Sequence, residues 1–172
     1  MDEIKEQLGG QIPESIVCSV GGGGLFNGIM RGLEKNGWND KVKVVTVETY
    51  GAESLFEAIK QKKLITLDGI KSVAKTLGAT QVSKKAFENA QKENVECTVL
   101  LDKEAVEACE QYFGEYGIWV EPSCGASLAL LKKKNFGGEK NGIIVVIVCG
   151  GNAANKELME YYKHNCYCPD SE

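Results

Sequence analysis

Four consecutive glycines, residues 21–24, are the residues whose type and spacing point most directly to chemistry. They follow a short β-rich run over residues 15–20 and precede a helical pattern over residues 25–36. Glycine permits positive φ angles and lets backbone N–H groups approach a ligand, and the amino end of a helix adds partial positive charge. A flexible turn is the alternative. The position at the carboxyl end of a strand, where ligands bind in parallel sheets, favours a phosphate site.

The glycine run does not match the common nucleotide motifs. A Walker A loop ends in Gly-Lys-Ser/Thr, whereas this run continues as Gly24-Leu25-Phe26. A Gly-x-Gly-x-x-Gly fingerprint that starts at Gly21 fails at Phe26. The sequence therefore favours a smaller phosphate ester. Glu48, at the end of the second predicted strand, would be the ribose-binding acid if the ligand were a nucleotide.

Seven cysteines form the second chemical feature of the sequence. Cys149 ends an apolar run and precedes two glycines, so it is either a small buried side chain or one that faces a ligand. The odd count and the polar opening residues 1–6 favour free thiols in a reducing compartment. We expect the cytoplasm, with the mitochondrion as the alternative. The tail motif His164-x-Cys166-x-Cys168 lacks the spacing and the fourth ligand that zinc prefers, which favours a polar tail.

The elements that must position these residues alternate along the chain. Strands are predicted over residues 15–20, 42–48, 95–101 and 143–149. Helices are predicted over residues 2–8, 25–36, 53–62, 83–93, 102–116, 123–134 and 155–164. Ser83 and Asp102 are predicted helix caps, and Gly117 is a predicted helix end. This order predicts an α/β fold, a parallel sheet with helices on both faces, in which the apolar 143–149 strand is buried on both sides.

Composition limits the classes of partner. The chain has 172 residues, of which 43% are hydrophobic and 26% charged, which suits one domain with a core. The net charge of −4 gives no reason to expect nucleic acid, because phosphate binding needs clustered positive charge. No apolar stretch approaches the ~20 residues of a membrane span, so no membrane partner is expected.

Five segments, taken in order, resemble one family. They are Gly21–Leu25, Val47–Ala52, Ser72–Ala79, Glu121–Ser127 and Val148–Asn152. Together they resemble the L-serine/L-threonine dehydratases that depend on pyridoxal phosphate (PLP), in the tryptophan-synthase-β superfamily of fold type II. Cys149, in place of the Ser or Thr of other members, makes eukaryotic L-serine dehydratases the nearest subgroup. The resemblance implies that residues 1–172 are a single PLP-binding domain without the N-terminal part of the full enzyme.

The resemblance implies an activity and a cofactor site. The activity is β-elimination of L-serine or L-threonine to pyruvate or 2-oxobutanoate and ammonia. The PLP phosphate would be held by the backbone N–H groups of Gly21, Gly22, Gly23, Gly24 and Leu25. Cys149 would face the pyridine nitrogen as a weak, neutral hydrogen-bonding partner, which suits elimination over transamination.

The resemblance also implies a site for a monovalent cation such as potassium. Its ligands would be the carboxylate of Glu48, the hydroxyl of Ser54 and the backbone carbonyls of Ala52, Leu77 and Ala79. The alternative for Glu48 is a carboxylate that caps a neighbouring helix.

The catalytic lysine of the family has no recognisable counterpart here. That lysine lies in a Ser-x-Lys-x-Arg type motif of the N-terminal half, as does the loop that grips the substrate carboxylate. Lys71 and Lys75 flank a segment with a structural role, and Lys84 and Lys85 lie on a predicted surface helix. We therefore expect no recognisable catalytic residue and no turnover by this chain alone.

Three readings of the missing motif remain open. The first is an enzyme fragment that forms a homo-oligomer or needs a complementing N-terminal chain, and that exposes an apolar face. The second is a non-catalytic module that binds PLP or another phosphate, or pairs with a full-length paralogue. The third is a nucleotide-binding protein.

Overall fold

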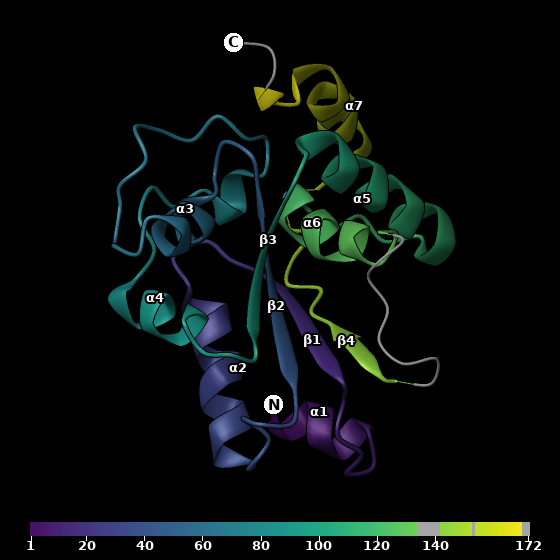
Figure 1. Cartoon of the computed structure of the whole chain (residues 1–172). Coiled ribbons are helices and arrows are strands. Elements are labelled where there is room, and N and C mark those ends of the chain that lie inside the picture. Colours follow the sequence, from purple (N-terminus) through teal and green to yellow (C-terminus); the bar gives the residue numbers. More distant parts are fainter. Residues whose placement is uncertain (134–141, 153, 170–172) are drawn as a thin grey trace.

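A parallel sheet forms the centre of the computed structural model, which describes residues 1–133, 142–152 and 154–169 (Figure 1). Within these residues the strands are β1 (Ser15–Ser19), β2 (Lys43–Thr49), β3 (Val95–Leu100) and β4 (Ile144–Val146). Their order is β3-β2-β1-β4, and every neighbouring pair is parallel. The predicted α/β class is confirmed.

Helices cover both faces of this sheet (Figure 1). On one side lie α2 (Gly24–Lys35), α3 (Ser54–Lys60) and α4 (Lys84–Ala90), and on the other lie α5 (Asp102–Tyr116) and α6 (Pro122–Leu130). The helix α1 (Asp2–Gln7) precedes β1, a 3-10 turn spans Lys75–Leu77, and α7 (Lys156–Asn165) packs against α5. No helix in the described ranges combines the length and apolar character that a membrane crossing requires.

The alternation of side chains along β1 divides the core between the two faces. Ile16 and Cys18 pack with Phe26 and Leu33 of α2, whereas Val17 packs with the alanines of α5 and α6. Successive strand residues point to opposite faces, so a strand covered on both sides must be apolar throughout. This explains why the run over 15–20 carries no polar–apolar alternation.

The last strand is shorter and less covered than predicted. An apolar run over 143–149 predicts a strand buried on both faces, but β4 is confined to Ile144–Val146 and is only half-buried. In the described part of the chain β4 lies at the edge of the sheet, and Val148 is 42% exposed. The prediction of burial was wrong because apolar composition does not reveal whether a neighbouring element covers the strand.

The predicted caps had mixed outcomes. Ser83 accepts a hydrogen bond from the Ala86 N–H at 3.3 Å and caps α4, and Gly117 ends α5 with a φ of 70°. Asp102 was wrong as a cap, because it is the first residue of α5 and its carboxylate turns inward. It accepts hydrogen bonds from the Ser72 hydroxyl and from the backbone N–H groups of Val73 and Tyr167.

Several predicted helices end earlier than the pattern suggested. The helix α3 ends at Lys60 and not at residue 62, α4 ends at Ala90 and not at residue 93, and α6 ends at Leu130. Part of the latter prediction, residue 134, lies outside the described residues. Within α6, a side chain at Gly125 would place Cβ 2.1 Å from the Ala105 carbonyl oxygen, so glycine lets α5 and α6 approach closely.

Candidate functional site

A cavity of about 310 Å³ lies at the carboxyl end of β1. It brings together the glycine run and Cys149, which are distant in sequence. The lining residues are Ser19, Gly21, Gly22, Gly23, Gly24, Leu25, Thr76, Glu121, Ser123, Cys149 and Gly150. This size is at the lower end of the range for sites that bind small molecules and cofactors.

The glycine loop is held in shape by the helix that packs behind it. The Gly22 carbonyl accepts a hydrogen bond from the Ser83 N–H at 3.0 Å, at the start of α4. Gly23 has a φ of 91°, and a Cβ there would lie 2.4 Å from the Cβ of Ala86. By contrast, a Cβ at Gly22 or Gly24 would meet no atom within 4 Å. The loop is therefore fixed on its α4 side and has space on the other.

The backbone N–H groups of this loop are available as donors. Among the hydrogen bonds of the described residues, none uses the N–H groups of residues 21–25. Because α2 begins at Gly24, its first N–H groups have no acceptor within the helix. Backbone donors of this kind, at a helix amino end that lines a cavity, fit a phosphate group.

Cys149 also lines the cavity, and its side chain has two polar partners. Its Sγ is 3.4 Å from the Ser19 Oγ and 3.3 Å from the Sγ of Cys124. Cys124 is buried and Cys149 is exposed. The Cys124 Sγ also accepts hydrogen bonds from the backbone N–H groups of Cys149 and Gly150, at 3.1 and 3.0 Å.

This pairing changes the protonation of both thiols. The hydrogen bond from Cys124 lowers the pKa of Cys149 to about 6; partial burial opposes the effect and Ser19 reinforces it. The same hydrogen bond, together with burial, raises the pKa of Cys124. The pairing therefore favours ionisation of Cys149 over ionisation of Cys124. The expectation of a neutral thiol at Cys149 was based on residue type alone and did not consider the hydrogen bond with Cys124.

Glu48 is a buried carboxylate, only 1% exposed, that binds the start of α3. Its Oε1 accepts from the Leu55 N–H at 2.8 Å and its Oε2 from the Phe56 N–H at 2.7 Å. Burial raises its pKa to about 8 although both hydrogen bonds lower it. The helix-capping alternative for Glu48 is therefore confirmed.

The other residues predicted to bind a cation have different surroundings. The Ser54 hydroxyl is buried and has no hydrogen-bond partner among the described residues. Ala52 is fully buried. The backbone of Leu77 approaches Gly21, and its carbonyl accepts from the Ala79 N–H at 2.9 Å. Ser54 directly precedes Leu55, whose N–H binds Glu48, and an unpartnered buried hydroxyl at this helix start is compatible with a hard cation.

Sequence reasoning missed several residues of the cavity. Thr76 and Ser123 share a hydrogen bond across it, and Ser19 and Cys124 both contact or flank the Cys149 thiol. Ser19 directly precedes the glycine run and Cys124 lies in a family-like segment, so both had a local signal. Their pairing with Cys149 is a tertiary contact that no spacing along the chain reveals.

Lysines are absent from the lining of this cavity in the described part of the chain. Lys75 reaches the Ile70 carbonyl at 3.4 Å, while Lys84 and Lys85 both form ion pairs with Glu88 on α4. None of these lysines is therefore placed to react with a ligand between the glycine loop and Cys149.

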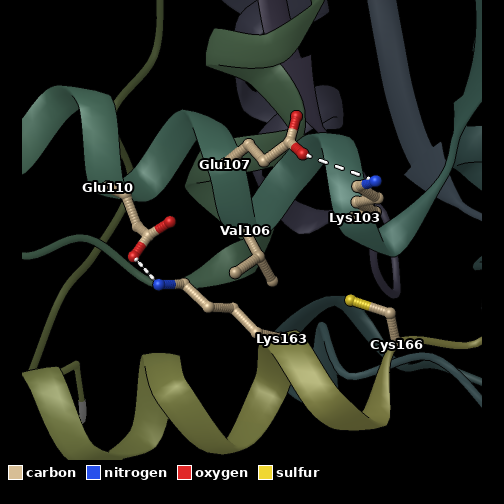
Figure 2. Close-up of a pocket in the computed structure, with 6 residues that line it drawn as sticks. All are labelled: Lys103, Val106, Glu107, Glu110, Lys163 and Cys166. Carbon is tan, nitrogen blue, oxygen red and sulfur yellow. Dashed lines mark ion pairs between the residues drawn. The ribbon is translucent and has the colours of Figure 1, made fainter.

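A second cavity, of about 350 Å³, lies between α5 and α7 (Figure 2). Glu110 pairs with Lys163 at 2.5 Å and Glu107 pairs with Lys103 at 3.9 Å, so the charges are largely compensated. Burial raises the pKa of Cys166 to about 11. The described residues hold no cluster of three or more groups that would bind a metal ion. Sequence analysis predicted no site here.

A parallel sheet with a glycine loop at the carboxyl end of a strand and a thiol in the same cavity fits a cofactor-binding domain. The family described as pyridoxal-phosphate dependent enzyme matches residues 1–150. The chain belongs to this family.

Its relatives are dehydratases. The chain is 38% identical over 172 residues to an L-serine dehydratase of Saccharomyces cerevisiae, covering 91% of this chain and 50% of the relative. It is 39% identical over 165 residues to the Dictyostelium discoideum L-serine dehydratase, covering 90% and 46%. A Saccharomyces cerevisiae chain named as a truncated L-serine dehydratase is 37% identical and is covered to 80%.

Solved structures give the same fold. The L-serine ammonia-lyase from Rhizomucor miehei superposes with a TM-score of 0.88 at 29% identity, covering 95% of this chain and 53% of that one. Threonine deaminase isoform 2 from Solanum lycopersicum, at 22% identity and a TM-score of 0.79, shares the fold over 95% of this chain and 46% of its own. The chain spans about half the length of most of the relatives named here.

Proposed function

We propose that this chain is the cofactor-holding part of a PLP-dependent L-serine/L-threonine dehydratase, an ammonia-lyase. The observation that carries the proposal is the cavity shared by the glycine loop and Cys149. The loop offers backbone donors for a phosphate, and the Cys149 thiol lines the same cavity as a partner for a ring nitrogen. PLP carries both groups, a phosphate ester on the side arm at C5 and a pyridine nitrogen two ring positions from that carbon.

The glycine loop, Cys149 and the neighbours of Cys149 have different roles in the proposed site. The N–H groups of Gly21, Gly22, Gly23, Gly24 and Leu25 bind the phosphate, and their fixed geometry orients the cofactor. Bound PLP supplies an electron sink that weakens the Cα–H bond of the amino acid. Cys149 binds the pyridine nitrogen, while Ser19 and Cys124 hold the thiol in place and set where its proton resides.

We propose that residues 1–172 form a single PLP-binding domain and that another polypeptide region supplies the lysine. The absence of lysine from the lining of the described cavity supports this proposal. So do the half-buried edge strand β4 and the exposed side chains of Val148 and Ile118, at 42% and 58%. An apolar edge of this kind favours a complementing N-terminal chain or a homo-oligomer.

We propose a monovalent cation, such as potassium, close to the Glu48 carboxylate. Its ligands would be Glu48, Ala52, Ser54, Leu77 and Ala79. The buried, unpartnered Ser54 hydroxyl supports the site, and a cation there would favour ionisation of Glu48, whose pKa burial raises to about 8. We also infer a reducing compartment, the cytoplasm, from the free thiols of the seven cysteines.

The experiment that tests the cofactor site compares one substitution at two positions. Gly22→Asp places a carboxylate where a Cβ has free space in the cradle, and Gly114→Asp places the same group on the exposed side of α5. Equilibrium dialysis should show PLP binding weakened roughly tenfold or more by Gly22→Asp, because like charges repel. Gly114→Asp should bind like the unmodified chain. Equal binding by all three chains would refute the cradle.

A non-catalytic phosphate-binding module is the second candidate, favoured by the same lack of a lining lysine. Mixing the chain with PLP and L-serine and measuring pyruvate separates activity from binding. We expect no pyruvate from the chain alone, and production once a polypeptide carrying the N-terminal half of a relative is added. Binding without rescue by that polypeptide would favour the module. Steady production by the chain alone would overturn the proposed need for an external lysine.

A further inference from the structure

Two thiols meet at the edge of the proposed cofactor site. The Sγ atoms of Cys149 and Cys124 are 3.3 Å apart, and they form the one hydrogen-bonded cysteine pair among the described residues. Cys149 is exposed at the cavity, whereas Cys124 is buried at the start of α6. An external reagent therefore reaches Cys149 first, with a second sulfur directly behind it.

The surroundings suit bond formation between these sulfurs. A disulfide has an S–S distance of about 2.05 Å, so the two atoms must approach by about 1.2 Å. Cys149 lies in an irregular segment after β4, which is less constrained than a residue in the sheet. The lowered pKa of Cys149 supports its role as the attacking thiolate.

We propose that Cys149 and Cys124 form an intramolecular disulfide when the chain meets a hydroperoxide, and that this bond withdraws the Cys149 thiol from the cavity. The Cys149 sulfur attacks a peroxide oxygen, the O–O bond breaks, and a sulfenic acid and water result. The Cys124 sulfur then attacks the sulfenic sulfur, the S–S bond forms and a second water leaves. Two thiols lose two electrons and two protons in total, and hydrogen peroxide is reduced to two waters.

The consequence for the cavity rests on the proposed function. In the disulfide, the Cys149 sulfur turns towards Cys124 and away from the Ser19 hydroxyl that it now contacts at 3.4 Å. The cofactor ring then loses its partner, so oxidation should lower PLP affinity and a dithiol reductant should restore it. The disulfide itself requires no cofactor, so a failure of the disulfide proposal can be distinguished from a failure of the proposed PLP site.

The test oxidises the full chain with hydrogen peroxide, blocks free thiols under denaturing conditions and digests after glutamate without reduction. Because Pro122 protects the bond after Glu121, this cleavage yields peptides 116–139 and 140–157, each with one cysteine of the pair. We expect these two peptides to be linked and the intact chain to lose two hydrogens. The proposal would be overturned if Cys124 remained open to alkylation while Cys149 was recovered as a sulfinic acid or linked to another cysteine.

Matched variants and PLP complete the design. Cys124→Ser should abolish the link and leave Cys149 to oxidise further, whereas Cys168→Ser, at an exposed cysteine outside the cavity, should not change it. If Cys124→Ser does not fold, the presence or absence of the link between peptides 116–139 and 140–157 in the unmodified chain tests the proposal. PLP added before peroxide should slow the link. If the link forms at the same rate with and without PLP, the disulfide is supported and the proposed position of the cofactor is contradicted. If PLP binds but no link forms, only the disulfide proposal is refuted.

Discussion

The two loops that enclose the cavity are built differently. The glycine loop follows β1, a fully buried strand with a partner on each side, and backbone hydrogen bonds fix it to β2 and α4. The Cys149 loop follows β4, a half-buried strand at the edge of the described sheet. Its N–H groups at Cys149 and Gly150 bind the sulfur of Cys124, a weak acceptor.

This difference gives the two loops different roles in the proposed site. The half that would hold the phosphate is preformed by the chain's own core. The half that would hold the ring depends on the state of a single thiol and on whatever covers the sheet edge. We therefore expect the phosphate end of the cofactor to bind before the rest of the site is assembled.

The largest effect is expected from Gly23→Val. The residue has a φ of 91° and a Cβ there would lie 2.4 Å from Ala86, so strain and overlap act together. We expect a loss of about 3 kcal/mol or more in the free energy of unfolding, with loss of PLP binding. Urea denaturation measures it. Gly28→Ala, in open space on α2, should be neutral or slightly stabilising. Equal stability of the two variants would show that the loop is not rigid.

A smaller effect concerns Glu48, near the end of β2. Its pKa is about 8 in the folded chain against an ordinary value of 4.5, so the folded chain binds more protons between these values. Stability should therefore be highest below pH 4.5 as far as this group is concerned, and should fall as pH rises through 8.

Glu48→Gln should remove this pH dependence and cost about 1–3 kcal/mol, because one α3 N–H loses its acceptor. Thermal melts across this range test it. Potassium should reduce the loss at high pH in the unmodified chain more than tetramethylammonium does. A flat profile in the unmodified chain would contradict the buried charge, and identical curves in both salts would contradict the cation.

Ser83→Ala tests how the glycine loop is anchored. Ser83 caps α4 through its hydroxyl, while its backbone N–H binds the Gly22 carbonyl. The variant keeps the backbone bond and loses the cap, so we expect a loss of about 1 kcal/mol with PLP affinity nearly unchanged. If PLP affinity falls as strongly as in Gly22→Asp, the backbone bond alone does not hold the loop.

Cys124→Ala should change the reactivity of Cys149 more than it changes unfolding. Alanine offers no hydrogen-bond donor to the thiolate, so the pKa of Cys149 should rise from about 6 towards the ordinary thiol value. The rate of iodoacetamide alkylation at Cys149, followed against pH, reports this shift. An unchanged profile would show that Cys124 does not control the thiol.

Local patterns predicted the rigid half of the site, and tertiary contacts determine the rest. The glycine run, the Ser83 cap and the end of α5 depend on neighbours within a few residues, so their residue types suffice. Asp102 looked like a cap by position, yet it binds Ser72 and Tyr167 from distant segments. The Cys124–Cys149 pair and the edge position of β4 likewise depend on which elements meet in space.

The central claim is that backbone amides of residues 21–25 hold the phosphate of PLP. The most direct measurement follows these amide signals by NMR in a labelled chain, while PLP, pyridoxal or inorganic phosphate is added. We predict large shifts at Gly21 to Leu25 with PLP, smaller ones with inorganic phosphate and almost none with pyridoxal. Shifts confined to the cavity between α5 and α7, with the glycine amides unchanged by PLP, would contradict the account.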